Sequence, residues 1–423
     1  MTAVDTAPAA PTPSAPRSAP DDSLGEHVRA YFRRVRGGEM GALPAVLGLV
    51  VLCAVFAAAR PAFFTAGNFA NLLPQGSAVT VIAMGLVFVL LLGEIDLSAG
   101  YTSGVCASIL ALALGDYGLP WYAAILVSLL TGTVIGLTLG SLVAKVGIPS
   151  FVVTLAAFLA FQGVVLLLIK GGTIVPIRNP TILAIGNKSL TPLAGWIFYL
   201  ICVLGYAAVQ LVRRSGRQRR SLPTEPMSLI GLRIGSLALF AGVGVYVLNM
   251  QRSRNPSIVS LQGIPIVVPI LVVLLVGLTF VLKRTRYGLH IYAVGGNREA
   301  ARRAGIKNDA IRISVFMICS TMAAVGGIIA ASRANSVDPN TGGSNVLLYA
   351  VGAAVIGGTS LFGGKGRVLD AVLGGAVIAI IDNGMGLIGV SAGVKYVFSG
   401  LVLLLAAGID ALTRRRAAAS GLR

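Results

Sequence analysis

Apolar blocks of about twenty residues, the length of helix that crosses roughly 30 Å of hydrocarbon, recur along most of this 423-residue chain. Runs such as 81–92 and 271–282 are apolar on every face. A membrane β-barrel needs shorter segments in which apolar and polar residues alternate. We therefore predict an all-α fold, a polytopic transmembrane helical bundle.

The composition agrees with this fold class, since 56% of residues are hydrophobic and only 12% are charged, which excludes a soluble domain. Residues 1–40 differ, because Pro, Ala, Ser and Thr dominate as far as Pro20 and charges follow. We predict a disordered cytoplasmic tail there, with no removed signal peptide. A transmembrane domain at 41–412 and a basic cytoplasmic tail at 413–423 complete the expected organisation.

Twelve segments qualify as spans, although the seventh contains Arg233 and the tenth is short and interrupted by glycine, so the count could be as low as ten. They are 43–59, 74–92, 98–114, 121–144, 151–169, 196–212, 234–250, 264–282, 311–331, 346–361, 368–388 and 394–412. Small residues recur in the third, fourth, ninth and eleventh segments, as is typical where membrane helices approach closely.

The basic residues predict the orientation. With the amino terminus inside, most of the 34 Lys and Arg residues fall on the inner side, and both termini lie in the cytoplasm. The strongest groups lie at 29–36, 213–220, 283–312 and 414–416. The net charge of +19 thus has a topological explanation and indicates no nucleic-acid partner.

No residue pattern indicates an enzyme. The four cysteines lie in four different apolar blocks, and only His27 and His290 could supplement them, so neither a disulfide framework nor a metal site is expected. The predicted spans contain no Ser and His pair and no His-Glu motif for intramembrane hydrolysis. We expect no catalytic residue and no bound cofactor in this chain.

Two carboxylates, Glu94 and Asp96, interrupt the apolar pattern in the segment 93–100, with glycine at either end and Ser98 beside them. Acidic groups at membrane depth are costly and usually line a cavity or meet a partner, so these three residues are candidates for a translocation path. The alternative is an inner loop whose carboxylates are solvated. The segment by itself does not decide between the two.

A second interruption, 357–366, could be the repeat partner of the first, and its Thr359 and Ser360 are further candidates for the translocation path. Its glycines before Lys365 invite comparison with a phosphate-binding P-loop. The comparison fails, because Thr359 stands where the first glycine is required and Gly366 where Ser or Thr is required. We predict no ATP site.

Between the eighth and ninth segments, local signals predict a short surface helix. Asn297 can cap its start, Glu299 suits the positive end of the helix dipole, Arg302 and Arg303 suit the negative end, and Gly305 can terminate it. By composition alone, a basic helix resting on anionic lipid is the more natural interpretation.

At 299–301 the sequence Glu-Ala-Ala is followed by three residues and Gly305, which resembles the pattern of binding-protein-dependent ABC permeases. The segments 93–100, 292–306 and 353–366 resemble the ribose and xylose permease family of bacterial ABC sugar importers, and Asp382-Asn383-Gly384-Met385 is similar to the xylose type. The resemblance runs from about residue 43 to 412, leaving the amino-terminal tail and the 213–226 loop unmatched.

The resemblance implies an inner-membrane permease that imports a monosaccharide such as xylose and catalyses no reaction itself. It also implies that a separate two-cassette ATPase holds ATP and Mg. It also implies an extracellular sugar-binding protein and a permease dimer. It assigns ATPase coupling to Asn297, Glu299, Ala300, Ala301, Arg302, Arg303 and Gly305. Asp382 and Asn383 join the path candidates, and Arg333, Asn335, Asp338 and Asn340 are candidates for contact with the binding protein.

A competing hypothesis is an ion-coupled secondary transporter of a small polar solute, motivated by Glu94 and Asp96 in a broken helix. The sequence fixes neither the sugar nor whether the permease pairs with itself or with a related chain.

Overall fold

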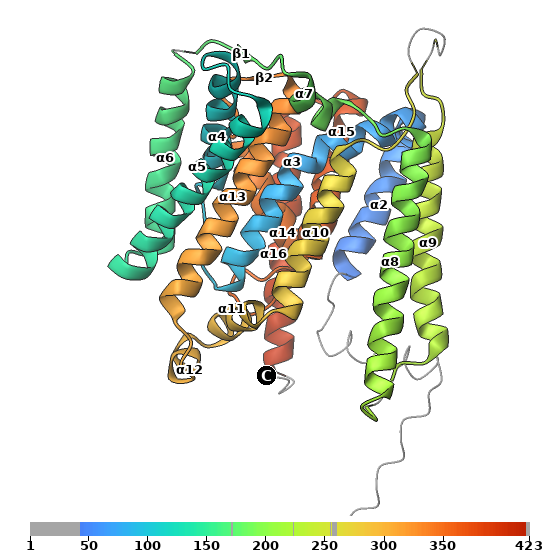
Figure 1. Cartoon of the computed structure of the whole chain (residues 1–423), viewed down its shortest axis with the longest axis vertical. Helices are drawn as coiled ribbons and strands as arrows, with labels where there is room; N and C mark the ends of the chain where they lie inside the picture. Colours follow the sequence, from blue (N-terminus) through green and yellow to red (C-terminus); the bar gives the residue numbers. More distant parts are fainter. Residues whose placement is uncertain (1–42, 171, 223, 254, 256–259, 420–423) are drawn as a thin grey trace, which may run out of the picture.

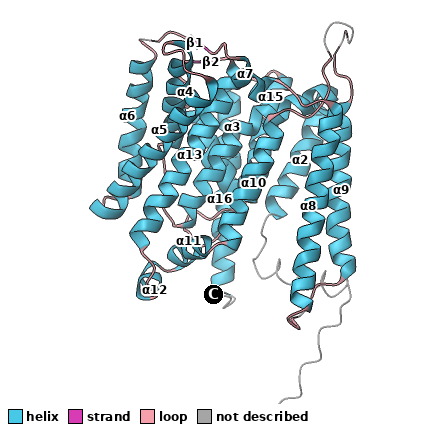
Figure 2. Cartoon of the chain, viewed as in Figure 1, coloured by secondary structure: helices cyan, strands magenta, loops and turns pink. Residues whose placement is uncertain are grey.

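The computed structural model describes residues 43–419, apart from 171, 223, 254 and 256–259. The predicted tail 1–40 and the last four residues of the predicted tail 413–423 lie outside the described residues. Most of the described chain is helical (Figure 2). The predicted polytopic helical bundle is confirmed at this level.

Each of the twelve predicted segments coincides with a helix. These helices are α2 (Leu43–Ala59), α3 (Ala66–Leu91), α4 (Ala99–Gly115), α5 (Trp121–Ser141), α6 (Ser150–Leu168), α8 (Pro192–Gln218), α9 (Met227–Asn249), α10 (Val267–Arg284), α13 (Asn308–Ala334), α14 (Ser344–Ile356), α15 (Val368–Ile388) and α16 (Ala392–Ala419). Among the described residues, eight of them are long and apolar enough to cross a membrane when α5 is taken together with the helical turn that follows it. The four shorter apolar helices are α2, α4, α14 and the first part of α16.

Short elements connect these helices. They are the helical turns η1 (Pro61–Phe64) and η2 (Leu142–Val146), the helices α7 (Pro180–Asn187), α11 (Arg286–Gly296) and α12 (Arg298–Arg303), and the strands β1 (Val175–Pro176) and β2 (Ser336–Val337). The strands pair antiparallel, with Val175 opposite Val337. They lie at one end of the bundle, the β end, whereas α11, α12 and the end of α16 lie at the other, the α12 end (Figure 1).

Two helices, α3 and α13, form the centre of the bundle. The segment 81–92 at the end of α3 is buried along its whole length, Gly85 included. A Cβ added at Gly85 would lie 3.1 Å from the carbonyl of Cys319 on α13. On the other side of α13, a Cβ at Gly136 of α5 would lie 2.4 Å from the carbonyl of Phe316. The predicted small-residue packing is therefore found at these crossings.

The pair α8 and α9 lies at the edge of the bundle, where the two helices pack on each other and α9 touches the start of α3 (Figure 1). Most of their side chains are exposed in this chain. Arg233 near the start of α9 pairs with Glu225, with 2.6 Å between Nη1 and Oε2. The pair therefore lies outside the central packing of α3, α13 and α15.

Candidate functional site

The helix α12 forms where the sequence predicts it. The side chain of Asn297 accepts a hydrogen bond from the backbone N–H of Ala300 at 2.9 Å and so caps the first turn. Gly305 ends the helix in the left-handed conformation, with φ of +82°. The Glu299 carboxylate accepts from Arg302 and Arg303, each at 3.1 Å. These bonds lower the pKa of Glu299, so the carboxylate is charged at neutral pH.

The surface of α12 is charged and open to solvent. Ala301 is its only buried residue and packs against the bundle, while Arg298, Glu299, Arg302 and Arg303 are exposed. A short helix that buries one small side chain and presents several charges to solvent is suited to a macromolecular contact.

Glu94 lies directly beneath α12. Its Oε1 is 2.7 Å from Nη2 of Arg298 and 2.8 Å from Nη2 of Arg312 on α13. Only 8% of the Glu94 side chain is exposed. Burial by itself would raise the pKa of Glu94, but the Ser150 hydroxyl and the two guanidinium groups together hold that pKa below its usual value. The carboxylate is therefore ionised and paired, not solvated.

Asp96 has a different environment from Glu94, although the two are neighbours in sequence. It is fully buried, and its Oδ1 accepts hydrogen bonds from the backbone N–H of Ser98 at 2.9 Å and from the Ser98 hydroxyl at 2.6 Å. These bonds hold the turn that leads into α4. Burial raises the pKa of Asp96, against the effect of the Ser98 bonds. Neither Asp96 nor Ser98 meets bulk solvent in this conformation.

The two glycine-rich interruptions lie against each other. The backbone N–H of Gly364 donates to the carbonyl of Leu91 at 2.8 Å, and Gly93 lies beside the carbonyl of Phe362. The end of α11 joins them, since Tyr292 donates to the carbonyl of Gly366 at 2.7 Å. A Cβ at Gly295 would lie 1.9 Å from the carbonyl of Leu91, so only glycine allows this approach.

Thr359 and Ser360 are buried inside the second interruption. The backbone N–H of Ser360 donates to the carbonyl of Lys365 at 2.9 Å, and the Ser360 hydroxyl accepts from the N–H of Phe362 at 3.1 Å. In this conformation these bonds shape the turn between α14 and α15.

Asp382 and Asn383 belong to a polar cluster between α15 and the first half of α3, which we call the amide cluster. Asn383 and Asn68 exchange two side-chain hydrogen bonds, each 2.9 Å long, and Asn383 also donates to Gln75 at 3.1 Å. Gln75 donates to Asp382 Oδ2 at 2.6 Å, and Lys395 of α16 lies 3.3 Å from Asp382 Oδ1. The cluster therefore joins three helices towards the β end.

The sequence-based reasoning missed three members of the amide cluster, Asn68, Gln75 and Lys395. A signal was present, because amides at 68, 71 and 75 recur at the helical spacing within an apolar block and so share one face of α3. Asn71 accepts from Arg333 at 3.1 Å.

The candidate residues for contact with a binding protein lie at the β end. Arg333 closes α13 and faces Asn71, and Asn335 follows in the left-handed conformation with its Oδ1 2.9 Å from Asn187 Nδ2. Asp338 accepts from the backbone N–H of Asn340 at 2.8 Å, so this part of the loop is held by its own turn. Asn335 and Asn340 are exposed.

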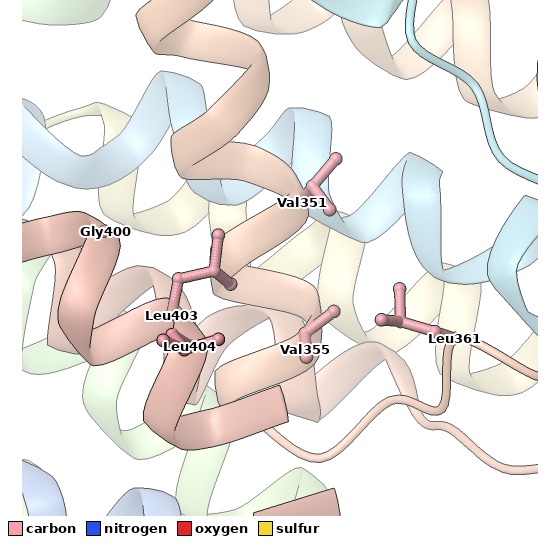
Figure 3. Close-up of a pocket in the computed structure, with 6 residues that line it drawn as sticks. All are labelled: Val351, Val355, Leu361, Gly400, Leu403 and Leu404. Atoms are coloured by element: carbon pink, nitrogen blue, oxygen red, sulfur yellow. The ribbon is translucent and has the colours of Figure 1, made fainter. Parts of the chain in front are cut away.

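An apolar cavity of about 390 Å³ lies between α14 and α16 (Figure 3). Its lining is Val351, Val355, Leu361, Gly400, Leu403 and Leu404. The side chains that line this cavity offer no hydrogen-bonding group, so the cavity does not suit a polar solute.

Metal-binding chemistry finds no support among the described residues, where no group of three or more His, Cys, Asp or Glu side chains converges. The four cysteines are free thiols.

Comparison with known proteins defines the class. Residues 68–407 match the family described as the permease component of the branched-chain amino acid transport system. The chain belongs to this family of permease components, and it is a multi-pass protein of the bacterial inner membrane.

Similar proteins include permeases that are named for xylose transport and for ribose import. The chain is 34% identical to the xylose transport system permease protein XylH of Haemophilus influenzae, over 88% of this chain and 96% of that protein. It is 36% identical to XylH of Escherichia coli K12, over 84% and 87% of the two chains. It is 29% identical to the ribose import permease protein RbsC of the same organism, over 90% and 96%. No solved structure matches the chain.

Proposed function

We propose that this chain is the permease subunit of an ATP-dependent monosaccharide importer and forms its translocation path. The observation that carries the proposal is α12, which is capped by Asn297, exposed on its charged face, and built on the Glu299-Ala300-Ala301 and Gly305 pattern of ABC permeases. A separate two-cassette ATPase docks on this helix and supplies ATP and Mg. The permease itself carries out no reaction.

The proposed substrate is xylose or another pentose or hexose. The xylose permeases that match almost the whole chain support this choice. The amide cluster supports it chemically, because Asn and Gln side chains both donate to and accept from hydroxyl groups, and Lys395 already compensates the charge of Asp382. The path runs past Asp382 and Asn383 along α3 and α15.

The proposed topology has twelve spans, with both termini and the α12 end in the cytoplasm. The β end then faces the extracellular side, where Arg333, Asn335, Asp338 and Asn340 meet the sugar-binding protein. Two copies of the permease, or this chain and a related one, share one ATPase.

The test is purification of the full-length chain together with its ATPase, followed by uptake of labelled xylose into vesicles in the presence of the sugar-binding protein. We expect ATP-dependent uptake, and loss of both association and uptake in Glu299→Lys, because the reversed charge meets Arg302 and Arg303 and removes the acidic group from the docking surface. Retained ATP-coupled uptake in this variant would remove the docking role from α12. Uptake of leucine but not of xylose would overturn the substrate assignment.

The competing secondary transporter makes a different prediction. Purified permease in vesicles, without any ATPase, would then accumulate solute in response to a proton or sodium gradient. The pairing of Glu94 with two arginines argues against a free ion-binding carboxylate at that position.

A further inference from the structure

Glu94 connects α12 to the centre of the bundle. Arg298 is the first residue of α12, and Arg312 lies one turn inside α13. Both guanidinium groups bond the same oxygen of Glu94, at 2.7 and 2.8 Å, although they lie 204 and 218 residues away in the sequence. One carboxylate thus holds together the ends of three elements.

Stability gives no sufficient reason for this arrangement. Removing a carboxylate from water is costly, and well-packed apolar side chains commonly replace buried ion pairs without loss of stability. What a shared carboxylate does supply is one defined arrangement of the groups around it. Arg312 is only 13% exposed and is fixed within the bundle, whereas Arg298 is 47% exposed and lies on the surface helix. The two partners of Glu94 therefore differ in how freely they can move.

Among the described residues, the remaining charges of α12 make no ion pair with another element. Glu299 bonds only Arg302 and Arg303 within its own helix, at i,i+3 and i,i+4 spacing. The buried Ala301 packs against the bundle, and the Asn308 side chain donates to the carbonyl of Arg298 at 2.8 Å. Arg298 is thus the charged residue that joins α12 to the bundle by an ion pair.

The loop that carries Glu94 leads directly into two central helices. Leu91 ends α3, and its carbonyl accepts from Gly364 of the second interruption. Asp96, two residues after Glu94, holds the start of α4 through Ser98. The opposite half of α3 carries Asn68 and Gln75 of the amide cluster, so one helix runs from the ion-paired loop to the proposed path.

We propose that Glu94 is the positioning residue that transmits displacement of α12 to α3. When the ATPase moves α12, Arg298 draws Glu94 and the end of α3 with it. This movement changes the position of α3 against α15 and so acts on the amide cluster. This inference rests on the proposed function of α12, and it separates two roles: Glu299 serves docking and Glu94 serves transmission after docking.

The experiment uses the complete complex of permease, ATPase and sugar-binding protein in lipid nanodiscs, with two separate measurements. The first is the amount of ATPase that copurifies with the permease, and the second is the stimulation of ATP hydrolysis by xylose-loaded binding protein. For Glu94→Gln we expect unchanged copurification and a fall in stimulation of about tenfold, within the usual range of coupling between sites.

Arg298→Gln covers the case in which Glu94→Gln fails to fold. It leaves the buried pair of Glu94 with Arg312 intact, and we expect the same loss of stimulation, with partial recovery in Arg298→Lys because the charge is restored. The matched control is Glu225→Gln. It breaks another Glu–Arg ion pair, the exposed pair of Glu225 with Arg233 near the start of α9, which lies away from α12. We expect wild-type values from this control in both measurements.

Wild-type stimulation in Arg298→Gln would overturn the transmission role. Loss of copurification in that variant would also overturn it, because the pair would then serve docking. The proposed function fails in a different way, namely if the wild-type permease copurifies with no ATPase or its ATPase ignores the loaded binding protein.

Discussion

The two polar clusters at opposite ends of α3 differ in charge and in the kind of hydrogen bond that they make. At the α12 end, Glu94 is ionised and shared by two arginines, and nearly all of its side chain is buried. Towards the β end, Asn68, Gln75 and Asn383 form mostly neutral amide bonds. Charge-assisted bonds fix one arrangement, whereas amides can exchange a protein partner for a sugar hydroxyl at little cost. The first cluster fits the transmission role that we propose, and the second fits the proposed path for a neutral solute.

Arg312→Ala tests the burial of the first cluster and has the largest expected effect. Removing this partner leaves a buried carboxylate half-compensated, and breaking a buried pair in this way costs about 3–5 kcal/mol. Arg298→Ala removes a partner that is half exposed, and we expect about 1 kcal/mol or less. Thermal unfolding of the purified variants measures both. Equal losses would show that the two arginines are held alike and would weaken the distinction between fixed and mobile partners.

Asn383→Leu tests the amide cluster. It leaves Asn68 and Gln75 short of a buried partner, for which we expect a loss of about 1–3 kcal/mol in stability. Xylose uptake should fall by more than this instability explains. The matched control is Gln210→Leu on the peripheral α8, where the amide bonds Tyr206 at 2.7 Å. If both variants transport equally well, the amide cluster is structural and lies outside the path.

Asn297→Ala tests whether α12 depends on its cap. Loss of the bond to the Ala300 N–H should cost about 1 kcal/mol of local helix stability and should not unfold the bundle. We expect faster proteolysis between α11 and α13 and weaker ATPase association, with an unchanged melting temperature. Asn297→Asp should retain the cap and restore normal association. A fall in melting temperature would instead make α12 part of the central packing.

Acidification has the smallest expected effect over the moderate range. Because the pKa of Glu94 in the folded protein is lowered, its pairing contributes stability above the unfolded value and is lost only as pH falls through the lower folded value. Melting temperatures should therefore show no loss attributable to Glu94 between about pH 7 and pH 5 and a decline below that range. Glu94→Gln should remove its share of the decline. A decline already complete above pH 5 would contradict an ionised, paired Glu94.

Local signals in the sequence were sufficient to predict the helices. An apolar block predicted each of the twelve helices of the bundle, because burial in hydrocarbon and satisfaction of the backbone leave a membrane segment few other choices. The same holds for α12, where Asn297 and Gly305 act on neighbours within a few residues. The identity of these elements therefore needs no knowledge of tertiary contacts.

The bonding partners of the polar side chains could not be predicted from local sequence signals. Glu94 and Asp96 share one short segment, and the sequence left open whether both carboxylates are solvated or line a path. The structure gives them separate roles, since Glu94 meets arginines from distant elements while Asp96 bonds Ser98 two residues away. Likewise, Asn383 meets Asn68 across 315 residues.

The sequence by itself thus determined the apolar helices, the exposed capped helix and the family pattern, since each depends on residues close together in the chain. Only the tertiary structure decided which loops meet at Leu91 and Gly364, which arginines share Glu94, and which amides face Asp382. The physical reason is that these contacts depend on the order in which helices pack. That order is set by close approach at residues such as Gly85 and Gly136, and hydrophobic spacing along the chain does not record it.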